Sequence, residues 1–150
     1  MNTSVRIRRA AMTAFVGGML VACGGGGDSP PAPPPTASVA LSGTASKGLM
    51  ADADVAVLPI NADGSIGSTA LATTTTDASG HYTLSFTATK DQPYVIQVKA
   101  KADGSTTHLD EVSDSTQSLP AGFTMRALLV PTATGTVTTK ATVRAKARLT

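Results

Sequence analysis

The sequence predicts a single all-β domain, and two observations carry this prediction. Apolar residues recur at every second position, as in half-buried strands. The strand formers Val, Thr, Tyr and Ile gather between stretches rich in Gly, Asp, Asn and Pro. We find no convincing helical stretch, and residues 37–150 have the length of one ordinary domain.

A basic, apolar leader precedes this domain. Arg6, Arg8 and Arg9 come before an uncharged run over residues 10–22. The run is shorter than the ~20 apolar residues of a transmembrane helix, but it fits the core of a signal peptide, which needs about 7–15. Residues 1–22 are therefore expected to be a signal peptide. The alternatives are an ordinary secretory signal with a coincidental cysteine, or an uncleaved anchor.

The leader ends in Leu20, Val21, Ala22 and Cys23, the last being the only cysteine in the chain. This tetrapeptide resembles the lipobox of bacterial lipoproteins. The resemblance implies recognition of Leu20, Val21 and Ala22 by the signal peptidase, cleavage before Cys23, and acylation of that cysteine. Three acyl chains exceed the two-signal threshold for stable anchoring. Because Gly24 stands where Asp would retain a lipoprotein in the inner membrane, the outer membrane of a Gram-negative cell envelope is the expected location.

A tether and a change of charge follow from this cleavage. Residues 23–38 are the lipidated cysteine and a Gly-rich, then Pro-rich linker, expected to be disordered and to hold the domain off the membrane. Without the leader, nine Lys and Arg remain against ten Asp and Glu, so the net charge changes from +2 to −1. This balance does not suggest a nucleic-acid partner.

The folded domain contains no cysteine once Cys23 is assigned to lipid attachment. Its stability is therefore expected to depend on an apolar core and not on disulfides.

The first predicted strand contains Val39 and Leu41 and ends at Gly43. Residues 55–58 form the second, which is expected to be buried on both faces and to end at Pro59 or lie at an edge. A turn over residues 61–65 and a Thr-rich strand over residues 68–76 follow.

The clearest predicted hairpin surrounds residues 77–80, Asp-Ala-Ser-Gly. It joins the Thr-rich strand to a strand over residues 81–86. Alternation places Tyr82, Leu84 and Phe86 on the inner face and His81 on the outer face.

The later strands are expected over residues 94–101 and 125–130, the second closed by Pro131. The turn at 102–105 repeats the Ala-Asp-Gly-Ser of 62–65, and the polar segment 106–118 predicts a weak strand or exposed loop. Residues 132–150 read as a Thr- and Lys-rich tail or an edge strand. Since the strands between 39 and 130 suffice for a sandwich, we expect the segment after Pro131 to be dispensable for folding.

Three stretches together resemble a known module. Ser42-Gly43-Thr44, residues 53–57 and residues 76–84 are similar to the carboxypeptidase-regulatory-like or transthyretin-like (prealbumin-like) modules of bacterial surface proteins. The resemblance implies a Greek-key β-sandwich of about seven strands over residues 39–131. Such modules are usually non-catalytic, so no enzyme activity and no cofactor are expected.

Two groups of residues in the sequence carry side chains that can bind metal ions. Hard oxygen ligands suit calcium, but Asp before Gly is mostly turn chemistry, and the EF-hand spacing is absent. A transition-metal site needs ligands that converge, whereas the second group reads as a solvated polar loop. The calcium group is Asp52, Asp54, Asn61, Asp63 and Asp77, and the second group is His108, Asp110, Glu111 and Asp114. Neither leads us to predict a metal site.

Catalysis and sugar binding find little support in the residues. No Gly-x-Ser-x-Gly elbow is present, and neither His81 nor His108 has a partner visible in the sequence. Sugars are usually held on exposed aromatic faces, and Tyr82, Phe86 and Tyr94 alternate inward. Phe123 is the remaining platform, although a core residue at a strand start is the better reading.

The sequence thus predicts a lipid-anchored cell-envelope protein that displays a non-catalytic structural or interaction module. Its partners are the membrane, through the N-terminal anchor, and an unidentified protein or polysaccharide. The alternatives are a calcium or carbohydrate binding module, or a fragment of a longer lipoprotein, adhesin or enzyme.

Overall fold

A computed structural model describes residues 30–110 and 112–144, and within them the chain forms ten strands and no helix. The all-β prediction is confirmed. The strands are β1 (Thr36–Ser46), β2 (Met50–Ala51), β3 (Asp54–Pro59), β4 (Ala72–Thr75), β5 (His81–Thr89), β6 (Tyr94–Lys99), β7 (Thr107–Asp110), β8 (Ser115–Ser118), β9 (Thr124–Leu129) and β10 (Gly135–Arg144). No helix among these residues is long and apolar enough to cross a membrane.

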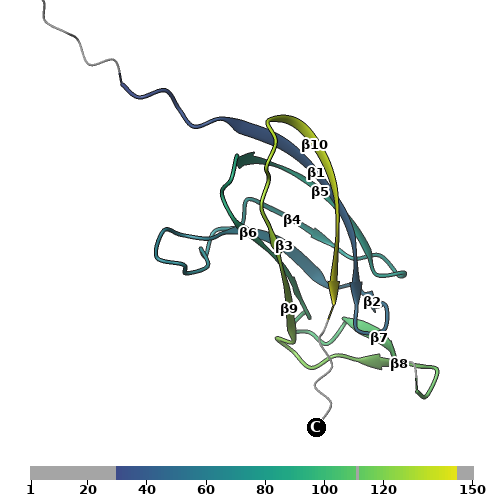
Figure 1. Cartoon of the computed structure of the whole chain (residues 1–150). Helices are drawn as coiled ribbons and strands as arrows, with labels where there is room; N and C mark the ends of the chain where they lie inside the picture. Colours follow the sequence, from purple (N-terminus) through teal and green to yellow (C-terminus); the bar gives the residue numbers. More distant parts are fainter. Residues whose placement is uncertain (1–29, 111, 145–150) are drawn as a thin grey trace, which may run out of the picture. The chain divides into compact units, whose positions relative to one another are not determined.

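Two larger sheets share one core, in a compact unit that begins at Pro33 (Figure 1). One sheet has the order β10-β1-β5 and the other the order β4-β3-β6-β9. Leu41 and Val143 from the first sheet and Val55, Ile96 and Val98 from the second are all at most 2% exposed. Together the two sheets contain seven strands, and a third sheet, β2-β7-β8, adds three more. Greek-key connectivity remains a prediction.

Strand β1 is longer than predicted. It begins at Thr36, inside the expected linker, and Ala37 is already in the core at 1% exposure. It also continues through Gly43, which was expected to end it. Gly43 remains in the strand because a close approach requires it: an added Cβ would lie 1.8 Å from the carbonyl oxygen of Ala141 and 2.4 Å from the hydroxyl of Tyr82.

Tyr82 links the two neighbours of β1 across this glycine. Residue Gly43 pairs with Tyr82 of β5 on one side and with Ala141 of β10 on the other. The Tyr82 hydroxyl passes over Gly43 and donates a hydrogen bond of 2.6 Å to the Ala141 carbonyl. A cross-strand aromatic side chain covering a glycine is a known device for pinning strand register. The predicted inner face holds, since Tyr82 and Phe86 are buried and Leu84 packs against the core.

The hairpin predicted around residues 77–80 is wrong, although its turn is real. The amide of Gly80 donates to the carbonyl of Asp77, at 2.9 Å, as a tight turn requires. The flanking strands, however, pair elsewhere: β4 pairs with β3, and β5 pairs with β1 in the other sheet. The turn therefore carries the chain between the two layers, because the long apolar strands β1 and β3 offer more pairing and burial than β4 and β5 offer each other.

Other elements follow the prediction with shifted limits. Pro59 ends β3 as expected, but β3 lies in the interior of its sheet, and the Thr-rich strand shrinks to the four residues of β4. Residues 94–99 and 124–129 form the expected strands. The polar segment after residue 106 forms two short strands, β7 and β8, which pair with each other and with β2.

The pairing and burial of β10 argue against the expectation that the segment after Pro131 is dispensable for folding. Ten consecutive residues, 135–144, pair in parallel with residues 37–46 of β1. Val143 has 0% exposure, while Val137 and Ala141 pack against the same core. Of the two predicted alternatives, a tail or an edge strand, the structure shows the edge strand for residues 135–144, and its inward residues belong to the core.

We predict that a chain stopped at Pro131 loses its cooperative unfolding transition. Removing β10 uncovers one side of β1 and the core around Val143, a loss comparable with the whole stability of about 5–15 kcal/mol of a small domain. Thermal unfolding followed by circular dichroism measures this, with a chain stopped at Arg144 as the control. A truncated chain that melts cooperatively within a few degrees of the control would restore the original expectation.

We also predict a Tyr82-dependent loss of stability at alkaline pH. Burial raises the pKa of Tyr82 from 10.0 to about 12, so the neutral phenol is favoured in the folded state. Its contribution is complete below pH 10 and is lost as the pH rises toward 12. Tyr82→Phe should cost about 0.5–1.5 kcal/mol at neutral pH by removing one hydrogen bond.

Denaturant unfolding of both proteins at a series of pH values provides the measurement. The difference between wild type and Tyr82→Phe should shrink above pH 10. A difference that stays constant to pH 12 would contradict this role of the buried phenol.

Candidate functional site

The predicted processing site lies in the part of the chain before residue 30, which the structure does not describe. Leu20, Val21, Ala22 and Cys23 lie outside the described residues, as do the signal peptide and the first half of the linker. Residues 30–35, at the end of the linker, are all exposed.

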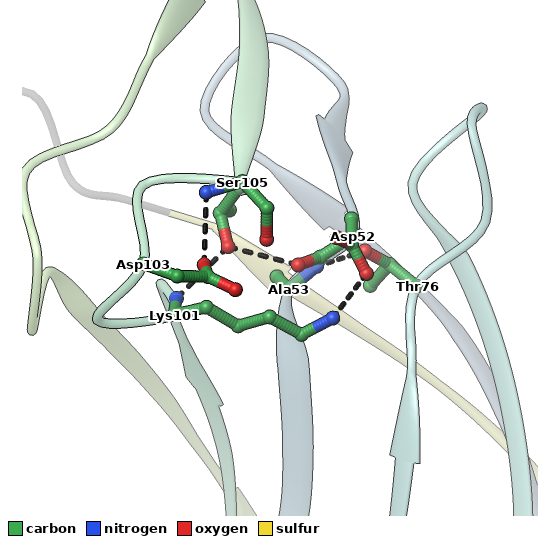
Figure 2. Close-up of polar contacts among 7 residues, drawn as sticks. Asp52, Ala53, Thr76, Lys101, Asp103 and Ser105 are labelled. Atoms are coloured by element: carbon green, nitrogen blue, oxygen red, sulfur yellow. Dashed lines mark hydrogen bonds and ion pairs between the residues drawn. The ribbon is translucent and has the colours of Figure 1, made fainter.

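A group of polar contacts joins three connections between strands at the end of the sandwich farthest from Thr36. We call this group the distal cluster: Asp52, Ala53, Thr76, Lys101, Asp103, Ser105 and Thr106 (Figure 2). Its members come from the link between β2 and β3, the segment after β4, and the loop between β6 and β7. Each segment lies just outside a strand, so the cluster fixes the relative positions of three connections between strands.

Thr76 holds the first two segments together. Its hydroxyl accepts a hydrogen bond of 2.9 Å from the amide of Ala53, and its own amide donates to the carbonyl of Ala53, also at 2.9 Å. The amide of Asp52 donates to the carbonyl of Thr76, at 3.2 Å. Thr76 is only 4% exposed, and its hydroxyl adds a side-chain hydrogen bond to the two backbone bonds that join these segments beyond the end of β4.

Thr106 joins the third segment to the first. Its buried hydroxyl accepts from the amide of Lys101 at 2.9 Å and donates to the carbonyl of Asp52 at 2.8 Å. The ammonium of Lys101 reaches across the outside of this contact and forms an ion pair with the carboxylate of Asp52 (Figure 2). A buried hydroxyl that both accepts and donates leaves no unpaired polar group in the junction.

The charges of the ion pair reinforce each other. The hydrogen bond from Lys101, with a second from Ser105, lowers the pKa of Asp52. The same bond to Asp52, with the nearby charges of Asp54 and Asp103, raises the pKa of Lys101. Both shifts favour the charged forms of the two groups, so the pair stays ionised at neutral pH and clamps the loop after β6 to the link before β3.

Three aspartates, one of them in the distal cluster, accept hydrogen bonds from the backbone of their own turns. Asp63 and Asp103, from the two Ala-Asp-Gly-Ser tetrapeptides, each accept a hydrogen bond of 2.9 Å from the amide of the following Ser. Asp77 accepts from the amides of His81 and Ser79, and these bonds lower its pKa. The repeated tetrapeptide is thus one local turn used twice.

The sequence-based metal candidates do not converge in the structure. Among residues 30–110 and 112–144, no group of three or more His, Cys, Asp or Glu is placed to hold a metal ion. Glu111 lies outside the described residues. Asp110 accepts from the amide of Val112 and from Ser113, so it also belongs to a turn.

The two histidines and Phe123 occupy separate places. His81 is exposed on the outer face, as expected, 3.8 Å from Asp77. His108 lies in β7, and its Nδ1 is 3.2 Å from the carbonyl oxygen of Gln117. Phe123 packs partly against the core, and the ammonium of Lys47 lies 5.7 Å from its ring centre. A core residue at the start of β9 is therefore the correct reading of Phe123, and one face of its ring is already covered by a cation.

Sequence reasoning missed the two threonines that organise the distal cluster. Both belong to a Thr-rich chain in which they look like ordinary strand or loop residues. The available signal is their position, since Thr76 directly precedes the turn at 77–80, and Thr106 directly follows the turn at 102–105. A threonine beside an Asp-Gly turn has a hydroxyl placed to bond backbone groups that have left the ladder.

Comparisons with known proteins do not identify a family. No family model matches the chain, and no curated protein matches it. Among solved structures, a 9R-lipoxygenase from Cyanothece is similar over 75% of this chain at 10% identity, with a TM-score of 0.33. The chain spans 16% of the length of that protein. So low a score supports no argument about fold or activity.

We predict that Thr106→Val destabilises the domain by about 1–3 kcal/mol, because the partly buried amide of Lys101 and carbonyl of Asp52 lose their hydrogen-bond partner. Thr107→Val, one residue further along and partly exposed, should change the free energy of unfolding by no more than about 0.5 kcal/mol. Urea unfolding measures both variants, and hydrogen exchange should accelerate at the Lys101 amide. Equal costs for the two variants would show that Thr106 does not hold the junction.

Proposed function

We propose that this chain is a lipid-anchored protein of the cell envelope that displays a non-catalytic β-sandwich for a structural or interaction role. The leader ending in Cys23 supplies the anchor, and the linker before Thr36 supplies the tether. The displayed part is the compact unit that begins at Pro33.

The observation that carries the non-catalytic reading is how the polar side chains of the distal cluster are used. Thr76 and Thr106 are buried and bonded to backbone. Lys101 and Asp52 neutralise each other. These contacts hold loops in place, which suits a surface that presents a fixed shape to a partner. The expected partner is a protein or polysaccharide.

The anchor rests on the sequence of the leader. A short apolar core after three arginines, followed by Leu-Val-Ala-Cys, has the order of parts that lipoprotein processing requires. The Gly- and Pro-rich linker directly after Cys23 supports this reading, because a tether is needed only where a folded unit is attached to something else. The outer membrane is the proposed location, on the ground that Gly24 follows the cysteine.

We predict that Cys23→Ala abolishes stable membrane association of the full chain expressed in a Gram-negative host. The acyl chains on Cys23 provide the anchoring energy of about 0.8 kcal/mol per buried CH₂, and alanine cannot be acylated. Membrane fractionation after a high-salt wash measures the effect, with Ser38→Ala as the matched control. Retention of the Cys23→Ala chain in the washed membranes would contradict the lipoprotein assignment.

A further inference from the structure

The outward face of the sheet β4-β3-β6-β9 is divided into a polar half and an apolar half. Val55 and Val57 of β3 point into the core, so Asp54, Ala56 and Leu58 point outward. Strand pairing then places the outward residues in rows across the four strands. The two rows nearest the distal end are mostly polar and consist of Thr75, Asp54, Lys99 and Thr124, then Thr73, Ala56, Gln97 and Arg126.

The next row is entirely apolar. Leu58 pairs with Val95, and Val95 pairs with Leu128. Leu71 continues the row on the other side, because Ala72 pairs with Val57 and the amide of Leu71 donates to the carbonyl of Val57 at 2.9 Å. An outward sheet face is normally polar, so an apolar row that crosses β3, β6 and β9 and continues to Leu71, just before β4, needs a physical reason.

Beyond this row the apolar character continues. Val130 follows Leu128 by two residues, and Ile66 folds back to bridge with Ile60. The exposed fractions are 66% for Leu128, 45% for Leu71, 41% for Val130 and 38% for Ile66, whereas Leu58 and Val95 lie beneath at 8% and 6%. We call these six residues the tether-end face.

The tether-end face lies at the end of the sandwich where the linker joins. The amide of Lys90 donates to the carbonyl of Pro35, the last linker residue, at 2.9 Å. The amide of the next residue, Asp91, donates to the carbonyl of Pro131, at 2.8 Å, and Pro131 directly follows Val130. A short chain of hydrogen bonds thus connects the end of the linker to the apolar residues at the end of β9.

We propose that the tether-end face rests on a phospholipid bilayer. This proposal builds on the proposed function, in which the chain is anchored through Cys23. Residues 24–35 then separate the anchor from the domain and span at most ~3.3–3.6 Å each, or about 40 Å in all. A linker of this length keeps the end of the domain where it joins within reach of the lipid.

The amount of apolar surface favours lipid over a second copy of the chain. Four partly exposed aliphatic side chains fall far short of the ~800 Å² per partner that a stable protein interface buries. A lipid surface does not require a complementary shape. A contact too weak to hold the domain alone becomes effective when a tether keeps it at a local concentration in the millimolar range. The linker therefore provides reach, and the tether-end face orients the domain against the membrane.

The test places a fluorescent label at single sites of a vesicle-bound chain. A chain that begins at Gly24, and so contains the whole compact unit, carries an N-terminal polyhistidine tag and is bound to vesicles of phosphatidylethanolamine and phosphatidylglycerol with a nickel-chelating lipid. The nickel lipid replaces the acyl anchor, so the result does not depend on whether Cys23 is acylated. A nitroxide-labelled lipid quenches any label that enters the bilayer.

Leu128→Cys carries the reporting label. Thr73→Cys, on the polar half of the same face, and Leu109→Cys, a partly exposed apolar residue of β7 near the distal end, carry the control labels. We expect strong quenching at position 128 and little at the other two. The double change Leu71→Ser and Val130→Ser, in a protein that still melts cooperatively, should then remove the quenching at position 128.

Two results would overturn the proposal. One is equal quenching, or none, at all three positions. The other is that the cysteine at position 128 cross-links to the cysteine at position 128 of a second chain, while the nitroxide lipid does not quench the label. That result would make the tether-end face a contact between two copies of the chain.

Discussion

The parallel pairing of β1 with β10 is the constraint on which the rest of the domain depends. It brings residues about a hundred positions apart in the sequence into one ladder of ten pairs. With β5 on its other side, β1 becomes the middle strand of its sheet, and the side chains it turns inward, Val39 and Leu41, are almost fully buried. Gly43 permits the pairing locally, because only a residue without a Cβ leaves room for the Tyr82 hydroxyl to reach Ala141.

Local features of the fold could be predicted from the sequence, and partner choice could not. The turn at 77–80, the inward face of β5 and the end of β3 at Pro59 all follow from the chemistry of a few adjacent residues. The hairpin failed because strand pairing is a competition among distant segments, which period-two alternation does not reveal. The same limit explains why residues 135–144 could be predicted only as a tail or an edge strand: the three inward apolar residues of this Thr- and Lys-rich segment do not show that β1 is its partner.

The distal cluster could be predicted from the sequence only in part. An Asp that shortly precedes a Gly predicts a turn. The side chains of Asp63, Asp77 and Asp103 all accept hydrogen bonds within their own turns, as that chemistry requires. The roles of Thr76 and Thr106 depend on backbone groups that lie 23 and 54 residues away, at Ala53 and Asp52 respectively. No local pattern carries that information. The outward apolar row was missed for a similar reason. Leu58, Val95 and Leu128 become neighbours only through the pairing of three strands, and Leu71 joins them through its bond to Val57.

The direction of β1 relative to β10 also determines how the domain responds to mechanical load. A pull on Thr36 along the linker, resisted at the far end of β10 near Arg144, acts along the strands and not across them. In that geometry the inter-strand hydrogen bonds are loaded together in shear, whereas pulling adjacent ends of a hairpin breaks its bonds one after another. Because β1 is also paired antiparallel with β5 over nine positions, sliding it out requires both of its ladders to yield at once. The strand that receives the linker is therefore held on both sides against a pull along the linker.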